Sequence, residues 1–367
     1  MKLSHLQIEH FKNHETADFA FGDQFNFITG GNGLGKTNLL DAIHYACTGR
    51  SFFGRSDTYA IQFEQEFAFL KADVDRGREA PEEVKISISN NGPAKKQIHV
   101  DGGRRTRVSD HYGFIPVVMF TPAEIKLVNE GSRERRKFLD RIMSQANANF
   151  LRDIIEYSKL IDSRNELLNL LRERGNFDEI ALQAYDERLI PVMDRIHLAR
   201  REFIDGFSTR VEEAYSALTN EQEKISLAYL SDLSETNAEK LLSSNLQSDR
   251  YAARTTAGVH KDDLELSLNG HLLRAIGSQG QVKTSVIALH LAAYQFLKDE
   301  LGSSPLLLLD DIFEKIDEQR AGELLQMIGR DHYGQIFITD TDESRIERHM
   351  SKSKADKKIF KFDPPEK

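Results

Sequence analysis

The sequence predicts an α/β fold in which a strand-rich region carries a phosphate-binding loop and is interrupted by a helical insertion. Residues 30–37, GGNGLGKT, lie between a short apolar run and a helical pattern, and strand signals recur at both ends of the chain. The middle of the chain has the three-to-four-residue apolar rhythm of amphipathic helices. We therefore predict one discontinuous strand-rich domain, residues 1–120 and 221–367, with residues 121–220 as an inserted helical lobe.

The N-terminal part of the chain has strand signals and one helix signal. Residues 3–9 alternate apolar and polar side chains, which is typical of a strand with one buried face. FNFIT ends at glycines and predicts a buried strand, whereas TNLLDAIHYAC has apolar residues at helical spacing. Further strands are expected at residues 67–74, 84–89 and 115–120, and after the insertion at 224–230, 263–269, 305–311 and 335–340, with an edge strand and a frayed end in the C-terminal tail.

Two helical regions make up the middle of the chain. Residues 135–171 predict one long amphipathic helix or a broken pair, which Gly175–Asn176 should end. Residues 177–219 predict a second helical region that Pro191 should kink or interrupt. Together they suggest an antiparallel helical arm.

Net charge, cysteine content and hydropathy indicate which classes of protein are expected. The 367 residues carry 49 basic and 58 acidic side chains, a net charge of −9, which argues against a uniformly basic surface but allows a local basic patch. The single cysteine, Cys47, excludes an internal disulfide, and its place on the apolar helix face predicts a core position. With no signal-peptide pattern and no apolar run of membrane-spanning length, we expect a cytoplasmic protein without a membrane partner.

The loop GGNGLGKT fits the pattern G-x-x-x-x-G-K-[ST] in its expected strand–loop–helix context. Glycines let backbone N–H groups surround a phosphate, Lys36 neutralises the outer phosphates, and the Thr37 hydroxyl is placed on Mg²⁺. The helix that follows directs its N-terminus at the anion. The predicted nucleotide-binding residues are Gly30, Gly31, Asn32, Gly33, Leu34, Gly35, Lys36, Thr37 and Asn38.

A second carboxylate for the metal follows the leucine run PLLLLDD. Asp310 ends this predicted buried strand, and ligands of open α/β sheets bind at the carboxyl ends of strands. We expect Asp310 to bind Mg²⁺, directly or through water, and Asp311 to orient the attacking water. The alternative is that one of these acids only caps the following helix.

A polar, glycine-containing turn, Ser278-Gln279-Gly280-Gln281, opens another helical pattern upstream of Asp310. Such a helix start is a possible anion site, although a serine at a helix N-cap is common and needs no ligand. Taken alone, the turn leaves both interpretations open.

Together these motifs resemble those of ABC-type ATPases. GSQGQ stands where that superfamily has the signature LSGGQ and keeps Ser278, Gly280 and Gln281, while Gly277 and Gln279 depart from it. The segment EKID, residues 314–317, is similar to the D-loop. The resemblance implies that Ser278, Gly280 and Gln281 contact a nucleotide held by a second subunit.

Within this superfamily, six segments of the chain resemble the RecF family of bacterial recombination-repair proteins. The segments that resemble it, in the family's order, are LQIEHFKNHE, GKTNLLDAI, TGRSFFGRSD, FTPAEIKLVNEGSRERRKFLD, GVHKDDLEL and LLLLDDIFEKID. Val259 replaces the proline that the family usually has in GVHKDD.

The resemblance implies an ABC-type ATPase head, like that of SMC proteins but with a short helical lobe. Two copies would close on two ATP molecules, each between Lys36 of one copy and Ser278 of the other. The dimer would bind single-stranded or gapped DNA and act with RecO and RecR to load recombinase, in replication restart and SOS induction. With Asp311 in place of the glutamate of transporters, we expect a weak, DNA-stimulated ATPase that acts as a switch.

Two basic clusters, Lys95 to Arg107 and Arg133 to Lys137, are DNA-contact candidates that alternatively are solvated surface. His260, Asp262 and Asp263 suggest metal ligands, but a structural or nucleotide-proximal role is favoured because no second ligand pair is near. Two other functions share such a head: the ATPase subunit of a nuclease or phage-defence system, and the nucleotide-binding subunit of a transporter.

Overall fold

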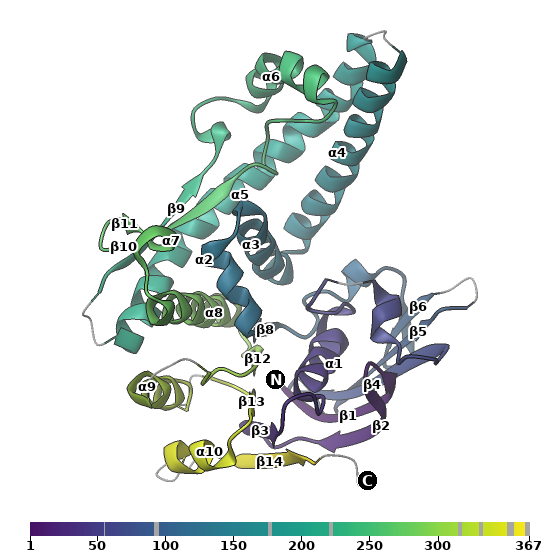
Figure 1. The fold of residues 1–367 in the computed structure, drawn as a ribbon. Helices are drawn as coiled ribbons and strands as arrows, with labels where there is room; N and C mark the ends of the chain where they lie inside the picture. Colours follow the sequence, from purple (N-terminus) through teal and green to yellow (C-terminus); the bar gives the residue numbers. More distant parts are fainter. Residues whose placement is uncertain are drawn as a thin grey trace. The chain divides into compact units, whose positions relative to one another are not determined.

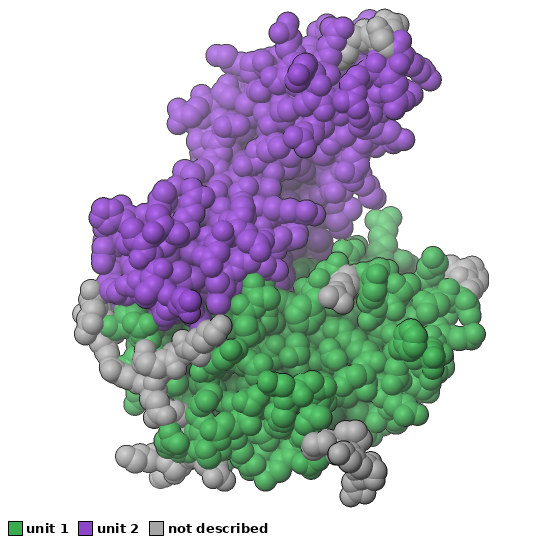
Figure 2. Space-filling view, viewed as in Figure 1, with its two compact units in different colours: residues 1–124, 217–220, 287–367 green, residues 125–216, 221–286 purple. Residues whose placement is uncertain are grey.

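The computed structural model describes residues 1–54, 56–91, 95–174, 178–219, 223–314, 318–329, 333–350 and 356–363. The chain divides into two compact units, which are described separately (Figures 1 and 2). Unit 1 comprises residues 1–124, 217–220 and 287–367, and unit 2 comprises residues 125–216 and 221–286. Residues 315–317 of the predicted D-loop, Gly175–Asn176 and the predicted frayed end at 364–367 lie outside the described residues.

A five-stranded sheet in unit 1 carries the phosphate loop. Its strand order is β14 (Lys357–Phe362), β3 (Phe25–Gly30), β13 (Ile336–Asp340), β12 (Leu306–Leu309) and β8 (Val117–Phe120), and every neighbouring pair is parallel. Strands β8 and β12 are apolar throughout, β13 is apolar up to Thr339 and Asp340, and all three are buried along their length, as parallel strands covered on both faces should be. The edge position of β14 confirms the strand predicted for the tail. Helices α9 (Glu318–Ile328) and α10 (Glu343–Met350) follow β12 and β13.

A six-stranded antiparallel sheet forms the rest of unit 1. Its order is β2 (His14–Ala20), β1 (Lys2–Phe11), β4 (Phe67–Asp75), β5 (Glu82–Ser89), β6 (Lys96–Val100) and β7 (Gly103–Arg105). Strands β4 and β5 alternate buried and part-exposed residues, so one face of the sheet is buried. Short 3₁₀ turns lie at Asp57–Ala60, Val108–Asp110 and Pro122–Ile125.

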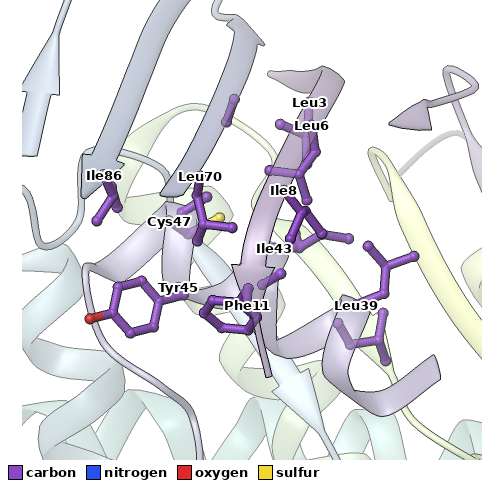
Figure 3. Close-up of a cluster of buried hydrophobic side chains, with 14 of the residues drawn as sticks. Leu3, Leu6, Ile8, Phe11, Leu39, Ile43, Tyr45, Cys47, Leu70 and Ile86 are labelled. Carbon is purple, nitrogen blue, oxygen red and sulfur yellow. The ribbon is translucent and has the colours of Figure 1, made fainter. Parts of the chain in front are cut away.

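Helix α1 (Lys36–Thr48) supplies much of the core of unit 1. Its apolar side chains, including Leu39 and Ile43, pack with Leu6 of β1 and Leu70 of β4 in one buried cluster (Figure 3). Cys47 belongs to the same cluster and is 1% exposed, which confirms its predicted core position, and burial raises the pKa of its thiol. The helix that begins at the phosphate loop is therefore fixed by the hydrophobic core.

Unit 2 is mainly helical. It contains α2 (Lys126–Asn129), α3 (Ser132–Ala146), α4 (Ala148–Arg174), most of α5 (Glu179–Thr219), α6 (Ala238–Ala252), α7 (Leu273–Ile276) and the start of α8 (Gln279–Leu301). Arg164 of α4 pairs with Asp186 of α5 at 2.7 Å, and Asp153 pairs with Arg195, also at 2.7 Å. Later residues of α4 therefore meet earlier residues of α5, which confirms the antiparallel arm that Figure 1 shows.

The structure decides between two sequence predictions for unit 2 and corrects another. The helical region from residue 135 is a broken pair, α3 and α4, separated at Asn147. Pro191 does not interrupt α5: it lies on an exposed position, while Leu189 and Val192 beside it are buried and hold the helix in place. Helix α6 was not predicted.

Residues 221–286 group with the helices of unit 2 rather than with the strands of unit 1. Strands β9 (Ile225–Leu230), β10 (Asp263–Leu268) and β11 (His271–Leu272) form a separate three-stranded sheet, and β10 packs against α3. The head boundary predicted at residue 221 is therefore not the boundary between the units. Among the described residues, no helix has the length and hydropathy needed to cross a membrane.

Candidate nucleotide site

The phosphate loop joins β3 to α1 and leaves the start of the helix open to an anion. Gly35 is the N-cap of α1 in a left-handed conformation, with φ 101°, and no side chain caps the helix. This φ disfavours any residue with a side chain, and a Cβ atom at Gly35 would also displace the Asn13 amide, whose Nδ2 atom lies 2.5 Å away. Gly31, Asn32 and Gly33 are exposed. The first N–H groups of α1 therefore point at a site that a phosphate can occupy.

Lys36 lies inside the loop. The residue is 5% exposed, and its Nζ donates hydrogen bonds of 2.7 Å to the Gly30 carbonyl and 2.8 Å to the Gly31 carbonyl. Both acceptors are neutral, so the full charge of the ammonium group remains at the loop. Phosphate oxygens would be stronger partners for this donor than carbonyl oxygens.

Asp310 lies at the carboxyl end of β12, where the loop, β12 and β13 converge. The Thr37 hydroxyl donates to its carboxylate at 2.9 Å, and the Thr339 hydroxyl donates at 2.7 Å. Asp310 is 4% exposed, and this burial raises the pKa of its carboxyl group to about 6 even though both hydroxyl groups favour the charged form. The structure thus brings together Lys36, Thr37 and Asp310 from distant parts of the chain.

Asp311, the predicted water-orienting residue, has a left-handed backbone conformation with φ 41°. Its backbone N–H donates a 2.8 Å hydrogen bond to the Thr339 hydroxyl. A residue other than glycine rarely adopts this conformation, and such strain is found most often at functional sites. Thr339 therefore fixes both Asp310 and Asp311.

The donor set fits a magnesium ion. Thr37 offers a hydroxyl oxygen and Asp310 two carboxylate oxygens, which are the hard ligands that Mg²⁺ prefers. Among the described residues no group of three or more His, Cys, Asp or Glu side chains could hold a metal ion.

Sequence reasoning missed the residues beside the loop. The Asn38 amide donates to Asn13 Oδ1 at 2.7 Å, and Lys12 pairs with the fully buried Asp41 at 2.6 Å. Asp41 also accepts hydrogen bonds from Ser51 and from the Phe52 backbone. The sequence signal for these contacts was Asp41 itself, an acidic residue on the apolar face of α1 that needs a partner when it is buried. A cavity of about 470 Å³ opens here, lined by Lys12, Asn13, Thr37, Asn38, Ser51, Phe53, Ser56, Tyr59 and Ala60.

The predicted signature residues lie in unit 2, at the start of α8. Ser278 and Gln281 form a reciprocal capping box: the Gln281 N–H donates to the Ser278 hydroxyl at 3.2 Å, and the Ser278 N–H donates to the Gln281 side chain at 2.8 Å. The Gln281 amide also donates to Glu223, which accepts a hydrogen bond from Tyr215 of α5. Ser278 itself is exposed, and Gly280 is partly exposed.

The GVHKDD segment is part of an ion-pair network in unit 2. Asp263 pairs with Arg135 at 2.6 Å, and Asp262 pairs with Arg200 at 2.8 Å. His260 lies 2.6 Å from the Tyr157 hydroxyl, and burial lowers its pKa to about 4. These contacts support the structural role over metal ligation.

The same network accounts for much of the second basic cluster. Arg135 is 5% exposed, and Arg136 donates to the Asp262 carbonyl and to Ser132, so both are structural. Lys137 pairs with Glu134. In the first cluster Lys96 pairs with Asp57, whereas Lys95, Arg104 and Arg107 are exposed and form no ion pair within the described part of the chain.

The site combines a parallel sheet, a phosphate loop followed by a helix without a side-chain cap, and a buried aspartate at the carboxyl edge of the sheet. These features define a P-loop nucleotide-binding protein.

The family model of the RecF/RecN/SMC N terminal domain matches residues 2–360. The chain is 37% identical to the DNA replication and repair protein RecF of Flavobacterium johnsoniae, over 98% of this chain and 99% of that protein. It is 36% identical to the RecF of Phocaeicola vulgatus, over 98% and 96%. The chain belongs to the RecF family.

Solved structures show the same fold. The recombination mediator protein RecF-ATPrS in the RecFOR pathway matches with a TM-score of 0.86 at 29% identity, covering 94% of this chain and 93% of that one. The SmcHead bound to the C-winged helix domain of ScpA matches with a TM-score of 0.55 at 15% identity, covering 94% and 90%. The fold is that of an ABC-type ATPase head with an inserted helical lobe, as predicted.

Proposed function

We propose that this chain is an ATP-dependent DNA-binding protein of recombinational DNA repair that acts as a homodimer switched by ATP. The observation that carries the proposal is the convergence of Lys36, Thr37 and Asp310 at an uncapped helix N-terminus. Support comes from relatives named DNA replication and repair protein RecF and from solved RecF structures with ATP and ATPrS.

ATP occupies the loop with its phosphates on the N–H groups of residues 30–38. Lys36 exchanges its two carbonyl partners for phosphate oxygens, and the nucleoside enters the cavity between Lys12, Asn13 and Tyr59. Thr37 and Asp310 would hold Mg²⁺, which would neutralise charge on the phosphates. Asp311 orients the attacking water, and the Thr339 hydroxyl holds its strained backbone. The reaction is a slow, DNA-stimulated hydrolysis suited to a switch.

In the proposed dimer, Ser278, Gly280 and Gln281 of each copy complete the site of the other. Ser278 is exposed at a helix start, and its position is fixed by the capping box. The dimer binds single-stranded or gapped DNA in the cytoplasm and acts with RecO and RecR to load recombinase, with roles in replication restart and SOS induction. One solved relative is described as part of the RecFOR pathway.

Substituting Ser278→Arg is expected to abolish ATP-dependent dimerisation while leaving ATP binding intact. The large side chain blocks the contact across the dimer, whereas the substituted residue lies outside the phosphate loop. Light scattering with and without ATP measures the association, repeated with gapped DNA. Ser278→Thr, which keeps a hydroxyl and the cap, is the control and should still dimerise. If Ser278→Arg still dimerises with ATP, Ser278 of one copy does not complete the nucleotide site of the other.

The exposed cations of the first basic cluster are expected to contact DNA phosphates. Changing Lys95, Arg104 and Arg107 together to glutamate should lower the affinity for gapped DNA at least about tenfold and reduce the salt dependence of binding. Arg133→Glu, a single exposed arginine of the second cluster, is the matched control. Equal affinity of the triple variant and the wild type for gapped DNA would mean that DNA binds at another surface.

A cleavage assay tests the alternative function: nicking of DNA by the pure chain would favour the ATPase subunit of a nuclease system.

A further inference from the structure

Lys96 belongs to the first basic cluster in the sequence, but it does not share the exposure of its neighbour Lys95. Its side chain is 12% exposed, and its Nζ lies 2.7 Å from Asp57 Oδ2 and donates a 2.7 Å hydrogen bond to the Gly49 carbonyl. Burial lowers the pKa of Lys96, although the Asp57 carboxylate opposes this effect. The ammonium group is therefore used inside unit 1, and the DNA contacts proposed above do not account for it.

Asp57 connects Lys96 to the wall of the nucleotide cavity. It begins a 3₁₀ turn whose Tyr59 and Ala60 line the cavity of about 470 Å³ beside the phosphate loop. The Tyr45 hydroxyl of α1 donates a 2.6 Å hydrogen bond to the other oxygen of the same carboxylate, Oδ1. One carboxylate thus joins the cavity wall, the helix that begins at the phosphate loop, and the first residue of β6.

The C-terminal end of α1 contacts the same strand. Gly49 caps the helix in a left-handed conformation, with φ 70°, and a Cβ atom there would lie 2.8 Å from the Ile98 Cδ1 atom of β6. The Lys96 Nζ also lies 5.2 Å from the centre of the Tyr45 ring. Because this region is closely packed, a displacement of β6 must either move α1 and the cavity wall or break these contacts.

Strand β6 lies beside the exposed cations that are proposed to contact DNA. Lys95 immediately precedes it, and Arg104 of β7 is in register with His99 of β6. Stability alone does not explain a largely buried ion pair here, because replacing such a pair with apolar residues is often neutral or stabilising. What distinguishes this pair is its position, between the wall of the nucleotide cavity and the strand next to the proposed DNA contacts.

We propose that the Asp57–Lys96 pair links nucleotide binding to DNA binding within one copy of the chain. This inference rests on the proposed function. DNA phosphates held by Lys95 and Arg104 fix β6 and, with it, Lys96. Lys96 in turn holds Asp57, which fixes the turn at the cavity wall, so both are positioning residues. Because coupling between two sites is reciprocal, DNA raises the affinity for ATP by the same factor by which ATP raises the affinity for DNA.

The experiment measures the ATPγS affinity of the full-length wild type, Lys96→Met, Asp57→Asn and the double variant, with Mg²⁺, in the absence and presence of saturating gapped DNA. In the wild type, DNA should raise the affinity about tenfold. In each single variant this factor should fall to about two or less, while the affinities for ATPγS alone and for DNA alone stay within about twofold of wild type. The double variant should match the single variants, since the two side chains form one contact.

Lys85→Met is the matched control. Lys85 lies on the neighbouring strand β5, but its side chain is 44% exposed and its partner, Glu83, is on the same strand, so its loss should leave the coupling factor unchanged. Melting temperatures without ligands verify that each variant is folded.

Three results would overturn the inference. The first is an unchanged coupling factor in folded Lys96→Met, which would leave the pair a purely structural role even if the melting temperature falls. The second is a lowered affinity of Lys96→Met for DNA alone, which would make Lys96 a direct DNA contact. The third is a set of additive losses in the double variant. If DNA does not change the ATPγS affinity of the wild type, the ATP-dependent DNA binding of the proposed function fails as well.

Discussion

Replacing Lys36 with methionine is expected to abolish ATP binding, with a loss of at least about a hundredfold in affinity. Lys36 is the buried cation of the phosphate loop, and its Nζ lies 2.7 Å and 2.8 Å from two carbonyl oxygens. Charge-assisted hydrogen bonds to phosphate contribute about 1.5–3 kcal/mol each, and methionine supplies neither the charge nor the donors. Isothermal titration calorimetry with ATP and Mg²⁺ measures the loss.

The folded state of the Lys36→Met variant must be verified by its melting temperature without nucleotide. Methionine fits the space of the lysine stem, and it loses the two hydrogen bonds to Gly30 and Gly31, so a modest decrease is expected. Arg133→Met removes an exposed arginine of unit 2 and serves as the control for loss of one positive charge. ATP binding of near wild-type affinity by a folded Lys36→Met variant would mean that the loop does not hold the phosphates.

Substituting Arg200→Ala is expected to lower the free energy of unfolding by about 3–5 kcal/mol. Arg200 is 3% exposed and donates to Asp262 at 2.8 Å, to Asp140 at 2.9 Å and to the Val259 carbonyl at 2.7 Å. Although burial alone lowers it, the two carboxylates raise the pKa of Arg200 above its ordinary value. Alanine leaves both acids without their buried partner, which is why the loss exceeds that of an ordinary ion pair.

Arg195→Ala is the matched control for Arg200→Ala. Arg195 lies on the same helix and pairs with Asp153 at 2.7 Å, but its side chain is 50% exposed. Exposed ion pairs contribute about 0–1 kcal/mol, so this variant should unfold near the wild-type denaturant concentration. Urea unfolding followed by circular dichroism compares the two. Equal losses for Arg195→Ala and Arg200→Ala would show that burial of the network does not determine its contribution.

Local patterns in the sequence predict the elements of the site well. FNFIT, the glycine loop and the leucine run before Asp310 each give a strand or turn from a few neighbouring residues, and the structure places all of them as expected. The convergence of Lys36, Thr37 and Asp310 follows from a general rule, because parallel strands present their carboxyl ends at one edge.

Features that depend on tertiary contacts could not be predicted. Lys12 and Asn13 reach the loop only because the turn between β1 and β2 lies beside α1, and no periodicity encodes that contact. Charge clusters are equally ambiguous: RERRK looks like a surface patch, yet Arg135 is buried against Asp263. The strands of residues 225–268 are visible in the sequence, but their assignment to a separate sheet in unit 2 depends on long-range pairing.

The capping box at the start of α8 has a consequence for the chemistry of Ser278. A serine hydroxyl has one proton to donate and two lone pairs, and the Gln281 N–H uses only a lone pair. The capping box thus fixes the Ser278 oxygen without using its proton. Docking of a second copy need not break the cap, and Ser278→Asp, which keeps the cap but has no proton at neutral pH, would present a phosphate with repulsion instead of a hydrogen bond.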